Sequence, residues 1–523
     1  MIMPKYYYTI GLEIHAELKT QTKMFCSCKN DPNEKNPNTN ICPVCLAHPG
    51  TLPVLNKKAI ESVIKTGLAL GAGIANFTEF DRKNYFYPDI PKGYQISQYK
   101  YPIVSGGKLA NYGLNATDFR ITRVHLEEDT ANAKHDRGDY SLIDFNRAGL
   151  PLMELVTEPH TFDNPENTIK IASNFAKEFQ LILWYLDISE ANMEKGQMRV
   201  EANMSISLDP KKLGTKVEVK NLNSFRNMER AVQYEFERML KLFSENKQEE
   251  IVQETRGWDD AKQKTFSQRK KESSHDYRYF PDPDLPKLNL SEVFDLEKIK
   301  KELPELPAAK RIRYQTTSLT PPYGFGIKSE DIEMYINNLE LANYFEEIIK
   351  ILNGPSLTPQ CLEKIKLASN YITSDLMGLK AEVGKSDLSV LGKSDLPTSS
   401  SALEFQYPSP ENFAELINLA FENKISSRAA KDILAMIVVK DESPLKIATE
   451  KKLFQQNDEN SLKIIAQKII DENPQIVADY KNGKQTTGLT PLNILMSLVG
   501  KIMKATQGSA NPQLAQKVLI EIL

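Results

Sequence analysis

The order of hydrophobic and polar residues predicts strands in the first part of the chain. Over residues 8–18, apolar side chains alternate with Glu13, His15 and Glu17. The same period of two is typical of strands that have one buried and one polar face. The segments that show it are 8–18, 199–208 and 216–220.

Two helical patterns interrupt these strands. One begins near Asn164-Pro165, where Asn is a good N-cap and Pro suits the first turn, and the other runs from Phe225 to Phe243. Gly106-Gly107 predicts a hairpin turn between short strands. Strands with segregated helices favour an α+β domain.

The pattern becomes helical after the proline-rich stretch Pro281–Pro286. Helical segments such as Ile332–Leu352 follow, then a polar stretch, Lys393–Ser401, that is typical of a linker. The last 115 or so residues show helical patterns throughout. We therefore predict three parts: 1–295, 296–405 and 406–523.

Net charge and hydropathy exclude some classes of protein. The 523 residues include 66 basic and 69 acidic ones, for a net charge of −3. This balance excludes binding to nucleic acid by bulk charge, although local basic patches remain open. The most apolar candidate span, Ala59–Phe77, contains Glu61 and Lys65. We expect no membrane span and no signal peptide, and hence a cytoplasmic protein.

Four cysteines near the start of the chain form two close pairs. Cys26 and Cys28 are followed, after thirteen residues, by Cys42 and Cys45. Four thiolates suit a tetrahedral structural Zn²⁺ with no open position for catalysis. The alternative is four buried or disulfide-bonded cysteines, which a reducing compartment disfavours.

Carboxylates and one histidine form a dispersed second signal. Glu13, His15 and Glu17 share a strand face, Glu127-Glu128-Asp129 form an acidic cluster, and Glu154 lies in a later apolar segment. Such groups could hold Mg²⁺, which prefers oxygen ligands and keeps several waters. The alternative is a solvated strand face.

A third signal places cations beside aromatic residues. The stretch Asp81–Asp89 contains Arg82, Lys83 and Tyr85, which could bind a phosphate and stack on a base. Taken alone, the segment favours the alternative that its aromatic residues fill the core, and Ser274–Asp284 has the same ambiguity. Gly378–Ser386 ends in Gly-Lys-Ser, but its glycines are too far apart for a phosphate-binding P-loop. We also find no candidate glutaminase nucleophile.

Long ordered motifs resemble those of the B subunits of the aspartyl/glutamyl-tRNA(Asn/Gln) amidotransferases, the GatB family. The resemblance spans nearly the whole chain. The segments that carry it are Gly11–Leu18, Ala47–Val54, Asp81–Gln98, Val124–Thr130, Asp144–Pro159, Met198–Ser207, Val217–Arg230, Glu254–Trp258, His275–Pro286, Gly500–Thr506 and Gly508–Pro512.

The resemblance implies a strand-rich cradle catalytic domain, a helical domain and an all-helical tail similar to YqeY proteins that binds tRNA. It implies ATP-dependent phosphorylation of the side-chain carboxylate of Glu-tRNA(Gln) or Asp-tRNA(Asn), followed by amidation. Ammonia would come from an amidase A subunit, and a small C subunit would complete a heterotrimer. Two other functions stay open: a stand-alone ATP-dependent carboxylate–amine ligase, and a zinc-containing RNA-binding protein without catalysis.

The resemblance also implies roles for individual residues. It places Mg²⁺ on His15, Glu128 and Glu154, with Glu13 close by, and structural zinc on the four cysteines. On the polar strand faces, Glu201 and Lys220 join the predicted catalytic groups. The predicted substrate- and ATP-binding residues are Arg82, Lys83, Tyr85, Arg199, Asn203, Asn221 and Asp276.

Overall fold

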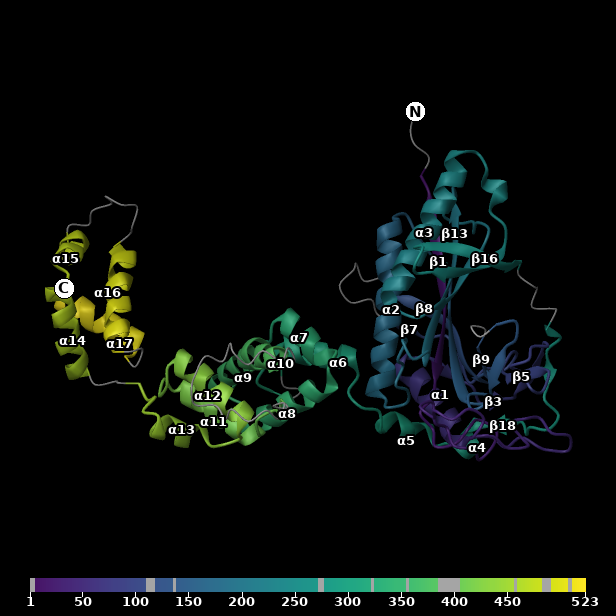
Figure 1. The fold of residues 1–523 in the computed structure, drawn as a ribbon, viewed down its shortest axis with the longest axis horizontal. Coiled ribbons are helices and arrows are strands. Elements are labelled where there is room, and N and C mark those ends of the chain that lie inside the picture. Colours follow the sequence, from purple (N-terminus) through teal and green to yellow (C-terminus); the bar gives the residue numbers. More distant parts are fainter. Residues whose placement is uncertain are drawn as a thin grey trace. The chain divides into compact units, whose positions relative to one another are not determined.

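The computed structural model divides the chain into two compact units, Met1–Pro307 and Ala308–Leu523 (Figure 1). It describes residues 5–109, 118–134, 138–270, 277–320, 324–353, 357–383, 405–455, 459–481, 491–506 and 510–523. The predicted linker Lys393–Ser401 lies outside these residues. None of the described helices combines the length and the apolar character that crossing a bilayer requires.

An 11-stranded sheet forms the centre of the unit Met1–Pro307. The strand order is β16-β15-β14-β13-β1-β11-β8-β6-β2, and β12 and β7 pair with β1 and β8. The strands are β1 (Tyr7–Glu17), β2 (Gly73–Ile74), β6 (Val104–Ser105), β7 (Lys108–Leu109), β8 (Phe119–Glu128), β11 (Pro151–Thr157), β12 (His160–Phe162), β13 (Met198–Ser207), β14 (Val217–Leu222), β15 (Glu254–Asp259) and β16 (Lys264–Lys270).

Helices cover one face of this sheet and leave the other face polar. Helices α2 (Pro165–Tyr185) and α3 (Phe225–Ser244) contact β1 and β13 (Figure 1). On β1 the side chains of Ile10, Leu12 and Ile14 are fully buried on the helix side. The period of two therefore directs Glu13, His15 and Glu17 to the opposite face, as predicted.

Local sequence explains where the two covering helices begin. The Asn164 side chain accepts a hydrogen bond from the Asn167 N–H, with Pro165 next in the chain. The Ser224 hydroxyl accepts one from the Asn227 N–H in the same way. Both contacts satisfy N–H groups that have no partner inside the first turn. The predicted starts of both helices are confirmed.

The predicted hairpin at Gly106-Gly107 is wrong. The strands on either side of it do not pair with each other, because β6 and β7 both pair with β8. The Gly106 N–H donates to the Thr122 carbonyl of β8, and both glycines have positive φ. The glycines therefore bend one edge of the sheet rather than reverse the chain.

Smaller elements surround the central sheet. The remaining elements of this unit are α1 (Lys57–Ala69), β3 (Phe77–Thr78), β4 (Asp81–Asn84), β5 (Tyr94–Ser97), β9 (Asn132–Lys134), β10 (Leu142–Asp144), η1 (Gln248–Glu250), β17 (Phe280–Pro281), β18 (Leu288–Asn289), α4 (Leu290–Val293) and α5 (Leu296–Lys301). Strands β4, β5 and β17 form one sheet, while β9 pairs with β10 and β3 with β18.

The described part of the unit Ala308–Leu523 is almost entirely helical. Its elements are α6 (Pro307–Gln315), β19 (Thr317–Ser318), β20 (Gly324–Phe325), α7 (Ser329–Ile336), α8 (Leu339–Asn353), α9 (Pro359–Asn370), η3 (Tyr371–Leu376), α10 (Met377–Val383), α11 (Pro410–Phe421), α12 (Ser427–Val439), α13 (Pro444–Glu450), α14 (Glu459–Asp471), α15 (Pro474–Lys481), α16 (Pro491–Ala505) and α17 (Pro512–Ile522). Together with the mixed sheet, these helices confirm the α+β class.

Two helical groups occur in this unit. Helix α11 packs against α8 and α9, whereas α14, α16 and α17 share a separate core around Leu462, Leu498 and Leu519. The helical segment predicted over Ile332–Leu352 is divided into α7 and α8, because the Asn338 side chain accepts from the Leu341 N–H and starts a new helix. The division at residues 295 and 405 stays a prediction.

Candidate functional site

The register of the central sheet aligns four polar side chains in one row. His15 on β1 is paired with Arg199 on β13 and with Glu154 on β11. Glu154 is in turn paired with His125 on β8. Directly opposite residues on adjacent strands have Cβ atoms about 5 Å apart, so these side chains lie next to one another on the polar face.

Three groups in and beside this row could bind one metal ion. His15 Nε2 lies 3.4 Å from Glu154 Oε2 and 3.6 Å from Glu127 Oε1. The possible ligand atoms of His15, Glu127 and Glu154 all lie within 4.8 Å of one another. Two carboxylate oxygens and one imidazole fit a divalent cation that keeps part of its water shell.

The predicted magnesium set names Glu128, but the structure places Glu127 rather than Glu128 beside His15. Glu128 Oε2 accepts from Lys92 Nζ at 2.5 Å, and its Oε1 accepts from the Ile96 N–H at 2.8 Å. Adjacent residues of a strand point to opposite faces, so the two glutamates cannot both reach the polar row.

In this row His15 and Glu154 shift each other's pKa toward the charged forms. Burial alone would lower the pKa of His15, but the charges of Glu154, Glu201 and Glu127 outweigh it and raise the pKa to about 9. Burial likewise opposes ionisation of Glu154, yet the imidazoles of His125 and His15 hold its pKa well below the usual range. A divalent cation bound here would replace the imidazolium charge as the partner of these carboxylates.

A second group of carboxylates lies further along β1. Glu13, Glu201 and Glu218 have carboxylate oxygens within 4.8 Å of one another. Lys220 Nζ lies 2.7 Å from Glu201 and 2.8 Å from Glu218, while the Asn203 amide donates to Glu13 at 2.8 Å. Burial, together with the charges of neighbouring glutamates, raises the pKa of Glu13. The structure thus brings predicted residues from β1, β13 and β14 together.

Arginines and one aspartate extend the polar face in the other direction. Arg147 and Arg199 both donate to Asp129 at 2.7–3.1 Å. Burial would raise the pKa of Asp129, but the charges of Arg199 and Arg147 lower it. Burial and the Asp129 charge raise the pKa of Glu17 to about 7. The predicted substrate residue Arg199 therefore already has a carboxylate partner.

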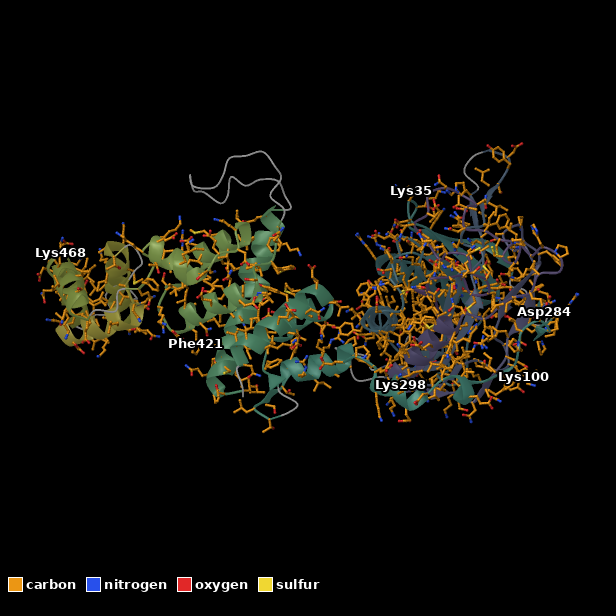
Figure 2. The ribbon with its side chains drawn as sticks, turned by 90° about the horizontal axis from the view of Figure 1, so that it is seen from below. Lys35, Lys100, Asp284, Lys298, Phe421 and Lys468 are labelled. Atoms are coloured by element: carbon orange, nitrogen blue, oxygen red, sulfur yellow. The ribbon has the colours of Figure 1, made fainter. Side chains whose placement is uncertain are left out.

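The residues predicted on β4 differ in their surroundings. Arg82 donates to Asp282 at 2.8 Å and to Asp284 at 2.9 Å. Asp284 is labelled in Figure 2. Because both contacts are with carboxylates of the protein, they do not support phosphate binding. Lys83 Nζ lies 5.2–5.8 Å from the ring centres of Tyr277 and Tyr85. Burial would lower the pKa of Lys83, but the Glu127 charge and other acidic groups raise it.

Two predicted substrate residues have no described side-chain contacts. Asn221 belongs to β14, in a sheet position next to Lys220, and Asp276 lies outside the described residues. Their roles in substrate binding stay predictions.

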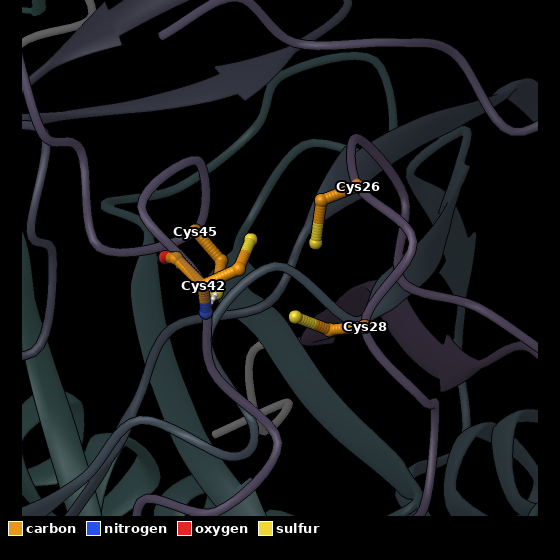
Figure 3. Close-up of side chains that lie close together, drawn as sticks. All are labelled: Cys26, Cys28, Cys42 and Cys45. Carbon is orange, nitrogen blue, oxygen red and sulfur yellow. Dashed lines mark hydrogen bonds between the residues drawn. The ribbon is translucent and has the colours of Figure 1, made fainter.

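The four N-terminal cysteines converge at one point (Figure 3). Their sulfur atoms lie within 4.8 Å of one another, and Cys45 is buried. The Cys42 N–H donates to Cys45 Sγ at 3.1 Å, and Lys23 Nζ lies 3.8 Å from the same sulfur. A hydrogen bond from Cys26 lowers the pKa of Cys45 to about 5, although burial opposes this. Four converging sulfurs with a stabilised thiolate fit structural Zn²⁺.

Several residues of the site were not predicted from the sequence. They are His125, Glu218 and Arg147, and Glu127 was predicted only as part of an acidic cluster. Glu218 could have been found, because it alternates with the apolar residues of its strand in the same way as Lys220. His125 and Glu127 required the register of β8.

Comparison with known proteins places this site in a family. Residues 8–294 match the family described as the GatB/GatE catalytic domain, and residues 361–523 match the family described as the GatB domain. The B subunit of the aspartyl/glutamyl-tRNA(Asn/Gln) amidotransferase of Thermotoga maritima is 41% identical over 99% of this chain and 99% of that protein. The chain belongs to the GatB family.

Further GatB relatives have a similar sequence identity to this chain over nearly its whole length. The corresponding B subunit of Caldanaerobacter subterraneus subsp. tengcongensis is 40% identical over 99% of each chain, and that of Persephonella marina is 40% identical over 98% of each chain. The GatB/GatE catalytic match contains the polar face and the four cysteines, and the second match begins within α9. The resemblance drawn from motifs alone is therefore confirmed.

Proposed function

We propose that this chain activates a carboxylate for tRNA-dependent amidation. The γ-phosphoryl group of ATP passes to the side-chain carboxylate of Glu-tRNA(Gln) or Asp-tRNA(Asn), giving an acyl phosphate and ADP. Ammonia then forms the amide bond and phosphate leaves, giving Gln-tRNA(Gln) or Asn-tRNA(Asn). The names of the relatives, which match over nearly their whole length, support this assignment.

The convergence of His15, Glu127 and Glu154 is the observation that carries the proposal. These residues would hold Mg²⁺, which when bound screens the phosphate and carboxylate charges that would otherwise repel each other. Lys83, which interacts electrostatically with Glu127, and Lys220, which pairs with Glu201, place further positive charge beside these residues. We assign ATP and the aminoacyl end of the tRNA to this face, together with Asn203. Asn221 and Asp276 stay substrate-binding residues predicted from the sequence.

Glu13 is the candidate proton acceptor. Ammonia must lose a proton after it attacks the acyl phosphate, and a carboxylate with a raised pKa accepts protons more readily than an ordinary one. Asn203 holds the Glu13 carboxylate in place with a hydrogen bond of 2.8 Å. We propose that this pair receives the proton during amide formation.

Other parts of the chain would support the reaction rather than perform it. The four cysteines would hold Zn²⁺ with no open coordination position, so that the ion stabilises the fold. The tail, residues 406–523, would bind the body of the tRNA through lysines such as Lys501 and Lys504. Ammonia would come from a partner amidase A subunit, with a small C subunit, in a cytoplasmic heterotrimer.

Reconstitution with an amidase partner tests the proposal. Glu-tRNA(Gln) and Asp-tRNA(Asn) would be supplied in parallel, with glutamine or free ammonia, and ADP release and amidated tRNA would be measured. We expect ADP release that depends on the aminoacyl-tRNA, and product from either nitrogen source. Amidation of a small free acid by the lone chain would instead indicate a stand-alone ligase, and tRNA binding without ADP release would indicate a non-catalytic RNA-binding protein.

A further inference from the structure

Glu154 contacts a second histidine that the proposed chemistry does not use. His125 Nε2 lies 3.4 Å from Glu154 Oε2, and His15 Nε2 lies 3.4 Å from the same oxygen. The sheet register explains this, because Glu154 is paired with His15 on one neighbouring strand and with His125 on the other. The carboxylate is therefore held between two imidazoles.

The two histidines differ in their access to the rest of the site. Within the described residues, the metal-binding group contains His15, Glu127 and Glu154 but not His125. The His125 side chain is 2% exposed, against 15% for His15. His15 thus belongs to the group that would meet a cation, whereas His125 contacts that group through Glu154.

The burial of His125 has a cost that packing does not explain. Its Nδ1 atom is buried and has no hydrogen-bond partner among the described residues. A buried polar atom without a partner costs about 1–3 kcal/mol. An apolar residue of similar size would avoid this cost, so the imidazole contributes something other than stability, and its described polar contact is the one with Glu154.

We propose that His125 is a positioning residue for the metal site, donating its Nε2–H to Glu154 Oε2 and fixing that carboxylate in the orientation that meets His15 and Glu127. This role rests on the proposed metal site. A carboxylate ligand that is held by an outer hydrogen bond does not need to reorganise when the cation binds. Loss of such an outer partner typically lowers metal affinity about 10–100-fold.

Mn²⁺ binding to the full chain tests this role independently of catalysis. Free Mn²⁺ would be titrated by electron paramagnetic resonance in the wild type, His125→Leu and His125→Gln. Leu keeps the volume without a donor, and Gln places an amide N–H near the position of Nε2. We expect His125→Leu to weaken Mn²⁺ binding about 10–100-fold and His125→Gln to restore most of that loss.

A matched control separates this effect from the loss of any buried histidine. His160 is also buried, and its Nε2 accepts from the Arg120 N–H at 3.0 Å, away from the metal group. His160→Gln is expected to leave the Mn²⁺ affinity unchanged. Thermal melting and zinc content would be measured for each variant, and His125→Gln supplies a second reading if His125→Leu fails to fold.

Three results would overturn the positioning role. Wild-type affinity in His125→Leu would make His125 an ordinary core residue. Electron spin-echo modulation from two directly bound imidazoles, one of which is lost in His125→Gln, would make His125 a ligand. No Mn²⁺ binding by the wild type would overturn the metal site itself, and the positioning role with it.

Discussion

The cysteine cluster and the polar face of the sheet bring metal ligands together in different ways. The candidate ligands Cys26, Cys28, Cys42 and Cys45 come from one continuous segment, whereas the candidates His15, Glu127 and Glu154 come from three strands. The first set depends on the folding of a short loop. The second exists only when β1, β11 and β8 are paired in the correct register.

This difference determines what each site can do. A loop that closes around four thiolates leaves no open position, so its metal contributes folding free energy. Side chains on a sheet present ligands on one side only, and that side stays open to waters, phosphates and a substrate carboxylate. The first arrangement suits stability, and the second suits chemistry.

Cys42→Ser should give the largest effect and would test the structural half of the comparison. Zinc binding by four thiolates contributes about 10 kcal/mol to folding, so losing one ligand should release the metal and lower the melting temperature of the unit Met1–Pro307. Metal analysis and calorimetry measure this. A zinc-free wild type, or a variant as stable as the wild type, would contradict it.

Paired substitutions at Glu127 and Glu128 test the catalytic half. Glu127→Gln should slow phosphoryl transfer on the order of a thousandfold, about 4 kcal/mol, because it removes a carboxylate from the metal group. Glu128→Gln should leave Mn²⁺ affinity unchanged, since Glu128 pairs with Lys92 on the other face. ADP release measures the rate of phosphoryl transfer, and Mn²⁺ titration measures the metal affinity, in each variant. The reverse result would favour Glu128, as predicted from the sequence.

Asn164→Ala should give the smallest effect. It shows how much a substitution away from both candidate metal sites changes stability and metal binding. It removes the cap of α2, which covers the apolar face of the sheet, and should lower the free energy of unfolding by about 1 kcal/mol. Zinc content and Mn²⁺ affinity should not change. Denaturant unfolding measures the loss, and a change in Mn²⁺ affinity would mean that the polar face depends on this helix end.

Much of the fold and the cysteine cluster could be predicted from local sequence. The alternation of Leu12 and Ile14 with Glu13 and His15 gives the faces of β1 without any knowledge of its neighbours. The caps of α2 and α3 are equally local. The cysteine spacing is sufficient for the convergence of the four sulfurs.

A local irregularity in β8 explains why alternation along the sequence does not select Glu127 over Glu128 for the polar face. Phe119 and Ile121 face the core, and continuing their alternation would bury Glu127 and direct Glu128 to the polar face. The register shifts beside Thr122, because Ile121 is paired with Thr157 while Arg123 is paired with Val156. This extra residue reverses the alternation, and no sequence signal marks it.

The central position of β1 has a consequence for synthesis on the ribosome. One neighbour of β1 is β13, and Asn203 follows its partner Glu13 by 190 residues. At the usual 5–20 residues per second, β1 waits roughly 10–40 s for that neighbour. During this time the edge of β1 that will pair with β13 keeps unpaired backbone N–H and C=O groups, which can pair with another chain. Emerging chains would therefore need chaperone shielding until β13 appears, and stalling before that point would favour aggregation.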